Sequence, residues 1–219
     1  DNDACDNRVW RLADAGFPCL TIAIDDAYAL GGEFFRWEFA TAVLANLLHV
    51  NPFDQPDVQS AKDASTRVLA HYVAHGSLPD VSASATLQSL PGRLSPCTYL
   101  GVMAYLCQRP ETDSVLTRFR RRVGALHRIS TTIGYGPRFL HSSGQLHKGG
   151  PDEGVFLQIV SGHPDDVPIP GREYSFGVVL DAQAMGDLQA LVTLGRPVAR
   201  LVLASDEPEL LARALEAVC

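Results

Sequence analysis

Lys62 is the first candidate for chemistry in this chain. Only Lys62 and Lys148 are lysines among the 18 lysine and arginine residues. Lysine can be tuned to give up its proton, whereas arginine stays protonated in proteins. Lys62 follows a rigid turn that contains Pro52 and Pro56, and the pattern from Val58 onward predicts a helix with Lys62 in its second turn. We therefore expect a defined position for this ammonium group; the alternative is that both lysines are ordinary solvated surface residues.

A second set of polar side chains lies in the glycine-rich segment 134–151. It holds five glycines, and glycine lets backbone amides approach an oxyanion closely. A cation beside such amides would complete a site for phosphate or a sugar phosphate. Neither GxxxxGK[ST] nor GxGxxG occurs here, so the segment matches no nucleotide motif. Its candidate ligands are Arg138, His141, Ser142, Ser143, Gln145, His147 and Lys148.

The two histidines of this segment suggest proton transfer. An imidazole is well suited to that task. His141 and His147 are six residues apart, so a regular helix would not place them on one face. A metal site that also used His163 and Asp165 is an alternative, but the spacing fits no recognised motif, and we expect no metal. Each histidine could instead be a loop residue with locally satisfied polar atoms.

Alternating strand and helix patterns predict an α/β fold, with mostly parallel sheets covered by helices on both faces. The segment 33–49 is apolar on nearly all sides, which predicts a helix buried within its domain or under a subunit interface. Strands are predicted at 20–24, 99–107, 131–134, 155–160, 175–180 and 198–203, and further helices at 7–15, from 58 onward, and at 111–128, 183–194 and 207–218.

Residues 76–96 are rich in serine, proline and glycine, which favours a linker or a mobile lid. They would separate a first domain at 1–75 from a second α/β domain at 97–219. The chain does not begin with methionine, so we expect a piece of a longer protein.

Composition narrows the class of protein. With 46% hydrophobic residues the chain can bury a core, and its net charge of −7 argues against nucleic acid as a partner. Five scattered cysteines without CxxC spacing indicate reduced thiols. No apolar run approaches the length of about 18 residues that a membrane span needs. We expect a cytoplasmic protein that does not bind membranes.

Three stretches resemble phosphoglucose isomerases. NPFDQPDVQSAK resembles the FDQ-x-GVE-x-GK signature near the carboxyl end of that family, and GGEFFRWEFATAVLANLLHV is similar to the helix before it. TTIGYGPRFLHSSGQLHKGGPDEGVFLQI resembles the isomerase half of bacterial bifunctional transaldolase/phosphoglucose isomerases. Asp57, Gln59 and Ala61 replace the Gly, Glu and Gly of the signature, and they flank Lys62 without replacing it.

The resemblance implies a sugar-isomerase (SIS)-like fold and the interconversion of glucose 6-phosphate and fructose 6-phosphate, as in glycolysis and gluconeogenesis, without a cofactor. GQLHKGG is similar to QLIHQG, which carries the ring-opening histidine of the family, although the order of the two motifs is reversed here. Lys62 and His147 would then serve ring opening, and Gln55 would help to bind the phosphate. Residues 1–75 would be the end of a sugar-phosphate domain.

The family's catalytic base, a glutamate in an ESxGK-like motif, has no counterpart before Lys62. The resemblance therefore implies a carboxyl-terminal isomerase part that is inactive, or nearly so, alone. Its partners would be a hexose phosphate, the remainder of the isomerase or transaldolase chain, and potentially a second copy. The alternatives are a sugar-phosphate-binding module with a regulatory or assembly role, and a metal-dependent hydrolase or isomerase that uses His141, His147 and His163.

Overall fold

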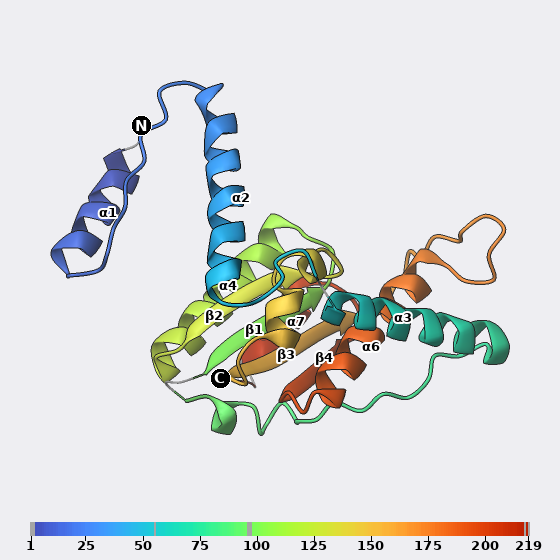
Figure 1. Cartoon of the computed structure of the whole chain (residues 1–219). Helices are drawn as coiled ribbons and strands as arrows, with labels where there is room; N and C mark the ends of the chain where they lie inside the picture. Colours follow the sequence, from blue (N-terminus) through green and yellow to red (C-terminus); the bar gives the residue numbers. More distant parts are fainter. Residues whose placement is uncertain (1–2, 55, 96–97, 217, 219) are drawn as a thin grey trace. The chain divides into compact units, whose positions relative to one another are not determined.

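The computed structural model describes residues 3–54, 56–95, 98–216 and 218 (Figure 1). The chain divides into two compact units, residues 1–54 and 55–219. The second unit thus begins before the segment 76–96, which we predicted to separate two domains. The reason is that the helix carrying Lys62, α3 (Pro56–His75), packs on α6 (Phe176–Thr193) of the same unit.

The described part of the first unit holds two helices, α1 (Asp3–Asp14) and α2 (Ala29–Leu47), both of which the sequence predicts. The strand predicted at 20–24 is wrong, because these residues form no regular structure. A strand must pair its backbone N–H and C=O groups with a neighbour. The described residues of this unit offer no second strand for such pairing.

Helix α2 does not bury its apolar side chains within its own unit. Ala45 is its one buried residue among those described, and Phe35, Phe39 and Leu47 are exposed. The expectation that this helix is buried within its domain is therefore not met by residues 1–54.

The second unit is built on a sheet of four parallel strands in the order β2-β1-β3-β4. The central strand β1 (Tyr99–Tyr105) pairs with β2 (Ser130–Tyr135) and β3 (Gly154–Ser161), and β3 pairs with β4 (Val198–Leu203). Strands β1 and β3 are almost wholly buried, as continuous apolar runs predict for a parallel sheet. The predicted α/β class is confirmed.

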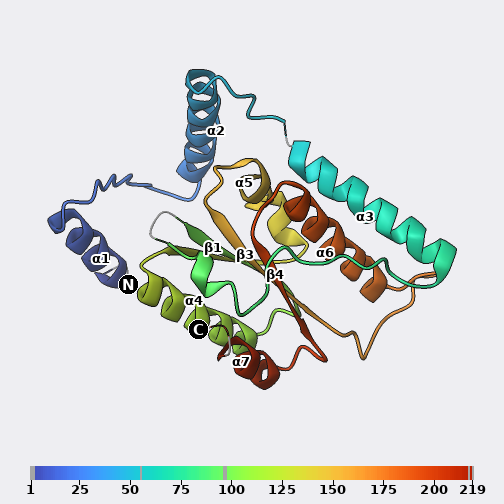
Figure 2. The same cartoon turned by 90° about the horizontal axis from the view of Figure 1, so that it is seen from below.

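Helices cover both faces of this sheet (Figure 2). One face packs against α4 (Pro110–His127) and α7 (Pro208–Glu216). The other packs against α5 (Gly144–Gly149) and α6, with α3 on the outer side of α6. Among the described residues, no helix combines the length and apolar character that a membrane span needs. Two 3-10 turns, η1 (Pro91–Arg93) and η2 (Arg138–His141), lie between these elements.

The strand predicted at 175–180 is wrong, because these residues begin α6. The side chain of Ser175 accepts a hydrogen bond from Val178 N at 3.3 Å, and Asp166 Oδ1 accepts one from Gly177 N at 2.7 Å. Both satisfy backbone donors of the first helical turn. The first turns of α6 are rich in valine and leucine, so their composition resembles that of a buried strand.

The segment 76–96 packs against the edge of the sheet. Ala85 forms a parallel bridge with Ala199 of β4, and Ser84 Oγ accepts a hydrogen bond from Val198 N at 2.9 Å. An open sheet edge would leave backbone groups unpaired. The segment therefore covers part of the β4 edge.

Helices α3 and α6 approach each other closely at Gly186. A methyl group at this position would lie 2.7 Å from Ser65 N and 3.0 Å from Ala61 O, both backbone atoms of α3. Ala61 and Ala64 on the facing side of α3 are buried. Small residues on both helices therefore allow their backbones to come together.

Gly186→Ala tests this packing. In an open helix the change would stabilise a protein by about 1 kcal/mol, because alanine has the higher helix propensity. Here the methyl group would meet backbone atoms, so we expect the free energy of unfolding, measured by urea denaturation, to fall by about 1–3 kcal/mol. Gln189→Ala, at an exposed position of α6, is the control and should change little. A gain in stability for Gly186→Ala would contradict the close packing.

Candidate functional site

Lys62 lines a cleft of about 250 Å³ in the second unit. Helix α3 contributes Lys62, Ser65 and Thr66, the turn η2 contributes His141, and α6 contributes Gln183. Helical residues three and four positions apart share a face, which explains how the three α3 residues reach the same side. The cleft brings an amine, an imidazole and several hydrogen-bonding groups together.

The charge and the hydroxyl groups of this cleft suit a polar anion. Lys62 is exposed and has no ion-pair partner among the described residues, and no aspartate or glutamate is found in the described lining. Ser65 Oγ donates to Ala61 O at 2.8 Å, and Thr66 Oγ1 donates to Lys62 O at 3.0 Å. Their oxygen atoms can still accept hydrogen bonds from a ligand.

His141 reaches the cleft because of the turn η2. Phe139 and Leu140 of this turn are buried in the core, and His141 at its end is exposed. The two apolar side chains anchor the turn, so the imidazole is held at the surface beside α3.

The imidazole of His147 lies in an aromatic part of the core and does not line the cleft. It is 3% exposed, and its ring centroid is 5.0 Å from that of Phe156, 5.7 Å from that of Phe139 and 6.3 Å from that of Tyr99. Neither ring nitrogen has a hydrogen-bond partner among the described residues. Burial, followed by the nearby charge of Lys148, lowers the pKa of His147 to about 4. This position does not fit the ring-opening role implied for His147.

Lys148 is also buried, and its Nζ lies 2.5 Å from Asp187 Oδ1 on α6. Burial raises the pKa of the Asp187 carboxyl, and the Lys148 ammonium opposes that shift. Breaking such a pair would leave an uncompensated buried charge. Lys148 therefore connects α5 to α6 here, whereas we predicted that it binds the substrate.

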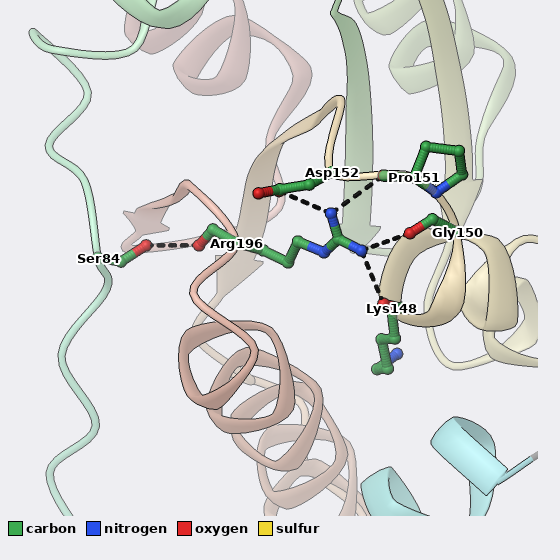
Figure 3. A network of polar contacts seen from close by, with 6 residues as sticks. All are labelled: Ser84, Lys148, Gly150, Pro151, Asp152 and Arg196. Carbon is green, nitrogen blue, oxygen red and sulfur yellow. Dashed lines mark hydrogen bonds and ion pairs between the residues drawn. The ribbon is translucent and has the colours of Figure 1, made fainter.

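Arg196 holds the end of α5 and is a residue that sequence analysis did not single out (Figure 3). Its Nη1 donates to Asp152 Oδ1 at 2.7 Å and to Pro151 O at 3.0 Å, and its Nη2 donates to Lys148 O at 3.0 Å and to Gly150 O at 2.5 Å. The last carbonyls of a helix lack partners within it, and a cation there is favourable. The guanidinium thus fixes the segment that carries two buried candidate residues, His147 and Lys148.

The glycines of the segment 134–151 serve close packing. A methyl group would lie 2.9 Å from Phe139 Cγ at Gly134 and 2.8 Å from Leu146 Cδ1 at Gly150. At Gly136 it would lie within 2.7 Å of the Tyr105 ring. At these three positions, glycine therefore allows a close approach to neighbouring side chains, including the buried rings of Phe139 and Tyr105.

The remaining predicted ligands do not line the Lys62 cleft in the described structure: Arg138, Ser142, Ser143 and Gln145. Arg138 donates to Gln108 Oε1, and Ser142 Oγ donates to Phe139 O at 3.1 Å. Gln55 lies outside the described residues. In the part of the chain that is described, no three His, Cys, Asp or Glu side chains are grouped to hold a metal ion.

Sequence reasoning missed three residues of the cleft, Ser65, Thr66 and Gln183. The helical period of α3 carried a signal for the first two, because they lie three and four residues after Lys62. No local signal pointed to Gln183, since its place depends on how α6 packs against α3.

Comparison with known proteins shows similarity over only part of the chain. No protein-family model matches the chain. A stretch of 58 residues is 47% identical to a glucose-6-phosphate isomerase of Acholeplasma laidlawii (strain PG-8A), and it covers 26% of this chain and 14% of that protein. A crystal structure of a hypothetical protein from Thermus thermophilus is similar with a TM-score of 0.47 and 15% identity, over 74% of this chain and 41% of that one. The sequence match supports a relationship with sugar isomerases over a short part of the enzyme's length.

The Arg196 contacts predict a loss of stability in Arg196→Ala. Carbonyl groups at the end of α5 would lose a charged donor in a buried place, so we expect the free energy of unfolding to fall by about 2–4 kcal/mol. Amide hydrogen exchange at Gly150 should also become faster. Arg172→Ala, which removes an exposed arginine from the loop before α6, should leave both measurements unchanged. Unchanged exchange in Arg196→Ala would show that the guanidinium does not hold this helix end.

Burial of His147 predicts that stability falls as the pH is lowered from 6.5 toward 4. The unfolded chain binds a proton on this histidine below a pKa near 6.5, whereas the folded chain does so only near pH 4. The linked loss is at most roughly 3 kcal/mol. His147→Leu should reduce the slope of unfolding free energy against pH over this range, measured by urea denaturation at several pH values. Equal slopes in both proteins would contradict a neutral buried imidazole.

Proposed function

We propose that the chain is part of a glucose-6-phosphate isomerase and that the Lys62 cleft binds the hexose phosphate. Two observations support this. A 58-residue stretch is 47% identical to such an enzyme, and Lys62 and His141 line one cleft. The second observation carries the proposal. Lys62 could bind the phosphate of the substrate, and His141 in the same cleft could transfer a proton.

The residues of the cleft suit the opening of a sugar ring. That step needs a proton delivered to the ring oxygen and one removed from the anomeric hydroxyl. An imidazole can do either when it lies within hydrogen-bond reach. His141 therefore takes the part that the family resemblance assigns to His147. The ammonium of Lys62 would bind the phosphate or stabilise the oxygen that becomes negative, and Gln183 would bind a sugar hydroxyl.

Isomerisation also needs a base that moves a proton between C2 and C1. Carboxylates are the usual alternative to histidine for such a role, and the described lining of the cleft has none. In this proposal the base comes from the remainder of the isomerase, which could itself be fused to a transaldolase. The 219-residue chain should then bind sugar phosphate without turning it over.

The same absence favours a second candidate function, a sugar-phosphate-binding module that regulates or assembles a larger enzyme. The two proposals predict different effects of Lys62→Ala in the complete protein. A catalytic part requires that Lys62→Ala abolishes isomerisation there, whereas a binding module would leave the turnover rate intact and change only its response to the ligand.

Calorimetric titration of the chain with glucose 6-phosphate tests the proposed site. We expect binding that weakens at least about tenfold in Lys62→Ala, because a direct charge-assisted contact to phosphate is lost. His141→Ala should weaken it less, because its contact is to the sugar. Arg67→Ala is the matched control, since it removes another exposed cation of α3 that lies outside the cleft. Equal losses in Lys62→Ala and Arg67→Ala, or no binding by the unmodified chain, would refute the proposal.

A further inference from the structure

A second cavity lies at the carboxyl ends of the parallel strands and shares no lining residue with the Lys62 cleft. It has a volume of about 440 Å³ and is lined by the residues that follow β1 and β3, including Cys107, Arg109, Ser161 and His163. The chain leaves β1 toward β2 through α4, and leaves β3 toward β4 through α6, on opposite faces of the sheet. Loops after two adjacent strands that diverge in this way frame the crevice where open α/β sheets bind ligands.

The charges in this crevice disfavour a phosphate. A helix N-terminus would ordinarily attract an anion, but the carboxylate of Asp166 already occupies that place on α6, with Oδ1 2.7 Å from Gly177 N. Hydrogen bonds from Ser175 and from Gly177 lower the pKa of Asp166, so it stays ionised. The helix that follows β3 thus offers its first amides to a side chain of this protein and not to a ligand.

Two carboxylates that line the crevice, Asp165 and Asp166, form no ion pair with a described residue. Arg109 Nη2 lies 3.0 Å from Asp206 Oδ2, and His163 Nε2 lies 3.1 Å from Asp181 Oδ1. Asp165 lines the same cavity, is exposed, and has no partner among the described residues. The net field inside the crevice therefore favours a cation.

Two further features point to a ligand. Ser161 is 7% exposed and lines the cavity, yet its hydroxyl forms no hydrogen bond with any residue that the structure describes. The hydroxyl of this largely buried residue is therefore free to bond with a molecule that enters the cavity. Phe176, which is 59% exposed, and Leu180 add an apolar wall. Pockets for small molecules combine such a wall with a few polar groups.

We propose that this crevice is a binding site for a small amine with an apolar body, distinct from the sugar-phosphate cleft. The ammonium group would pair with Asp165, the Ser161 hydroxyl would accept or donate a hydrogen bond at the floor, and the apolar body would pack on Phe176 and Leu180. This proposal does not depend on the function of the Lys62 cleft.

Titration of the full chain with benzylamine and with benzyl alcohol, followed through the amide signals of Gly162 and Gly177, tests this site. The two probes have nearly the same shape and differ in charge. We expect benzylamine to bind at least roughly fivefold more tightly, because of the ion pair with Asp165. Asp165→Asn should remove that preference, and Ser161→Ala should weaken both probes.

Two controls keep this test separate from the sugar-phosphate proposal. Glu173→Gln removes another exposed acid of the same loop that does not line the cavity, and Lys62→Ala changes the other cleft; neither should affect benzylamine. Equal affinity for the two probes, or no shift at Gly162 and Gly177, would overturn the proposal. So would tighter binding of glucose 6-phosphate at these amides.

Discussion

The packing of α6 between the sheet and α3 determines where the candidate groups of the second unit lie. It requires small residues at the contact, and Gly186 meets backbone atoms of α3 that no larger residue could approach. Because α3 is held in this way, Lys62 and His141 line one cleft together with Gln183 of α6. The same packing explains why the buried residues of α6 are small or apolar, with the exception of Asp187, which is paired with Lys148.

Buried charges give the glycine-rich segment its structural role. Lys148 pairs with Asp187, and Arg196 binds the carbonyl groups at the end of α5. Desolvated charges of this kind are costly unless they are fully compensated, so they fix the loop in one arrangement. In that arrangement His147 is enclosed by aromatic rings and stays neutral, and the turn before it presents His141 to solvent. The segment thus provides one wall of the cleft and only one of its polar groups.

Much of the fold follows from periodicity in the sequence. The apolar runs at 99–107, 155–160 and 198–203 correspond to strands of a parallel sheet, and the helix with Lys62 begins where its proline turn predicts. The failures have physical causes. Residues 20–24 have strand composition but no described partner strand to pair with. Residues 175–180 are mostly apolar and yet begin a helix, so composition alone could not separate helix from strand.

The candidate site was harder to predict than the fold. The sequence identified a lysine and a histidine-containing loop, and the motif resemblance singled out His147 for ring opening, whereas His141 lines the cleft. The choice between the two histidines depends on which side chain of the loop enters the core, and burial is set by packing against β1 and β3. Gln183 and the crevice after β3 arise from tertiary contacts between distant segments, for which one sequence has no local signal. Gly134 and Gly136, which look suited to an anion, lie against the rings of Phe139 and Tyr105.

Amine acylation followed by mass spectrometry tests the central claim most directly, because the chain has only two lysines. The claim is that Lys62 faces an open cleft that binds sugar phosphate while Lys148 is buried. In the native chain Lys62 should react readily, glucose 6-phosphate should slow that reaction, and Lys148 should react only after urea unfolds the protein. Comparable reaction of both lysines in the native chain, or a Lys62 rate that glucose 6-phosphate does not change, would contradict the account.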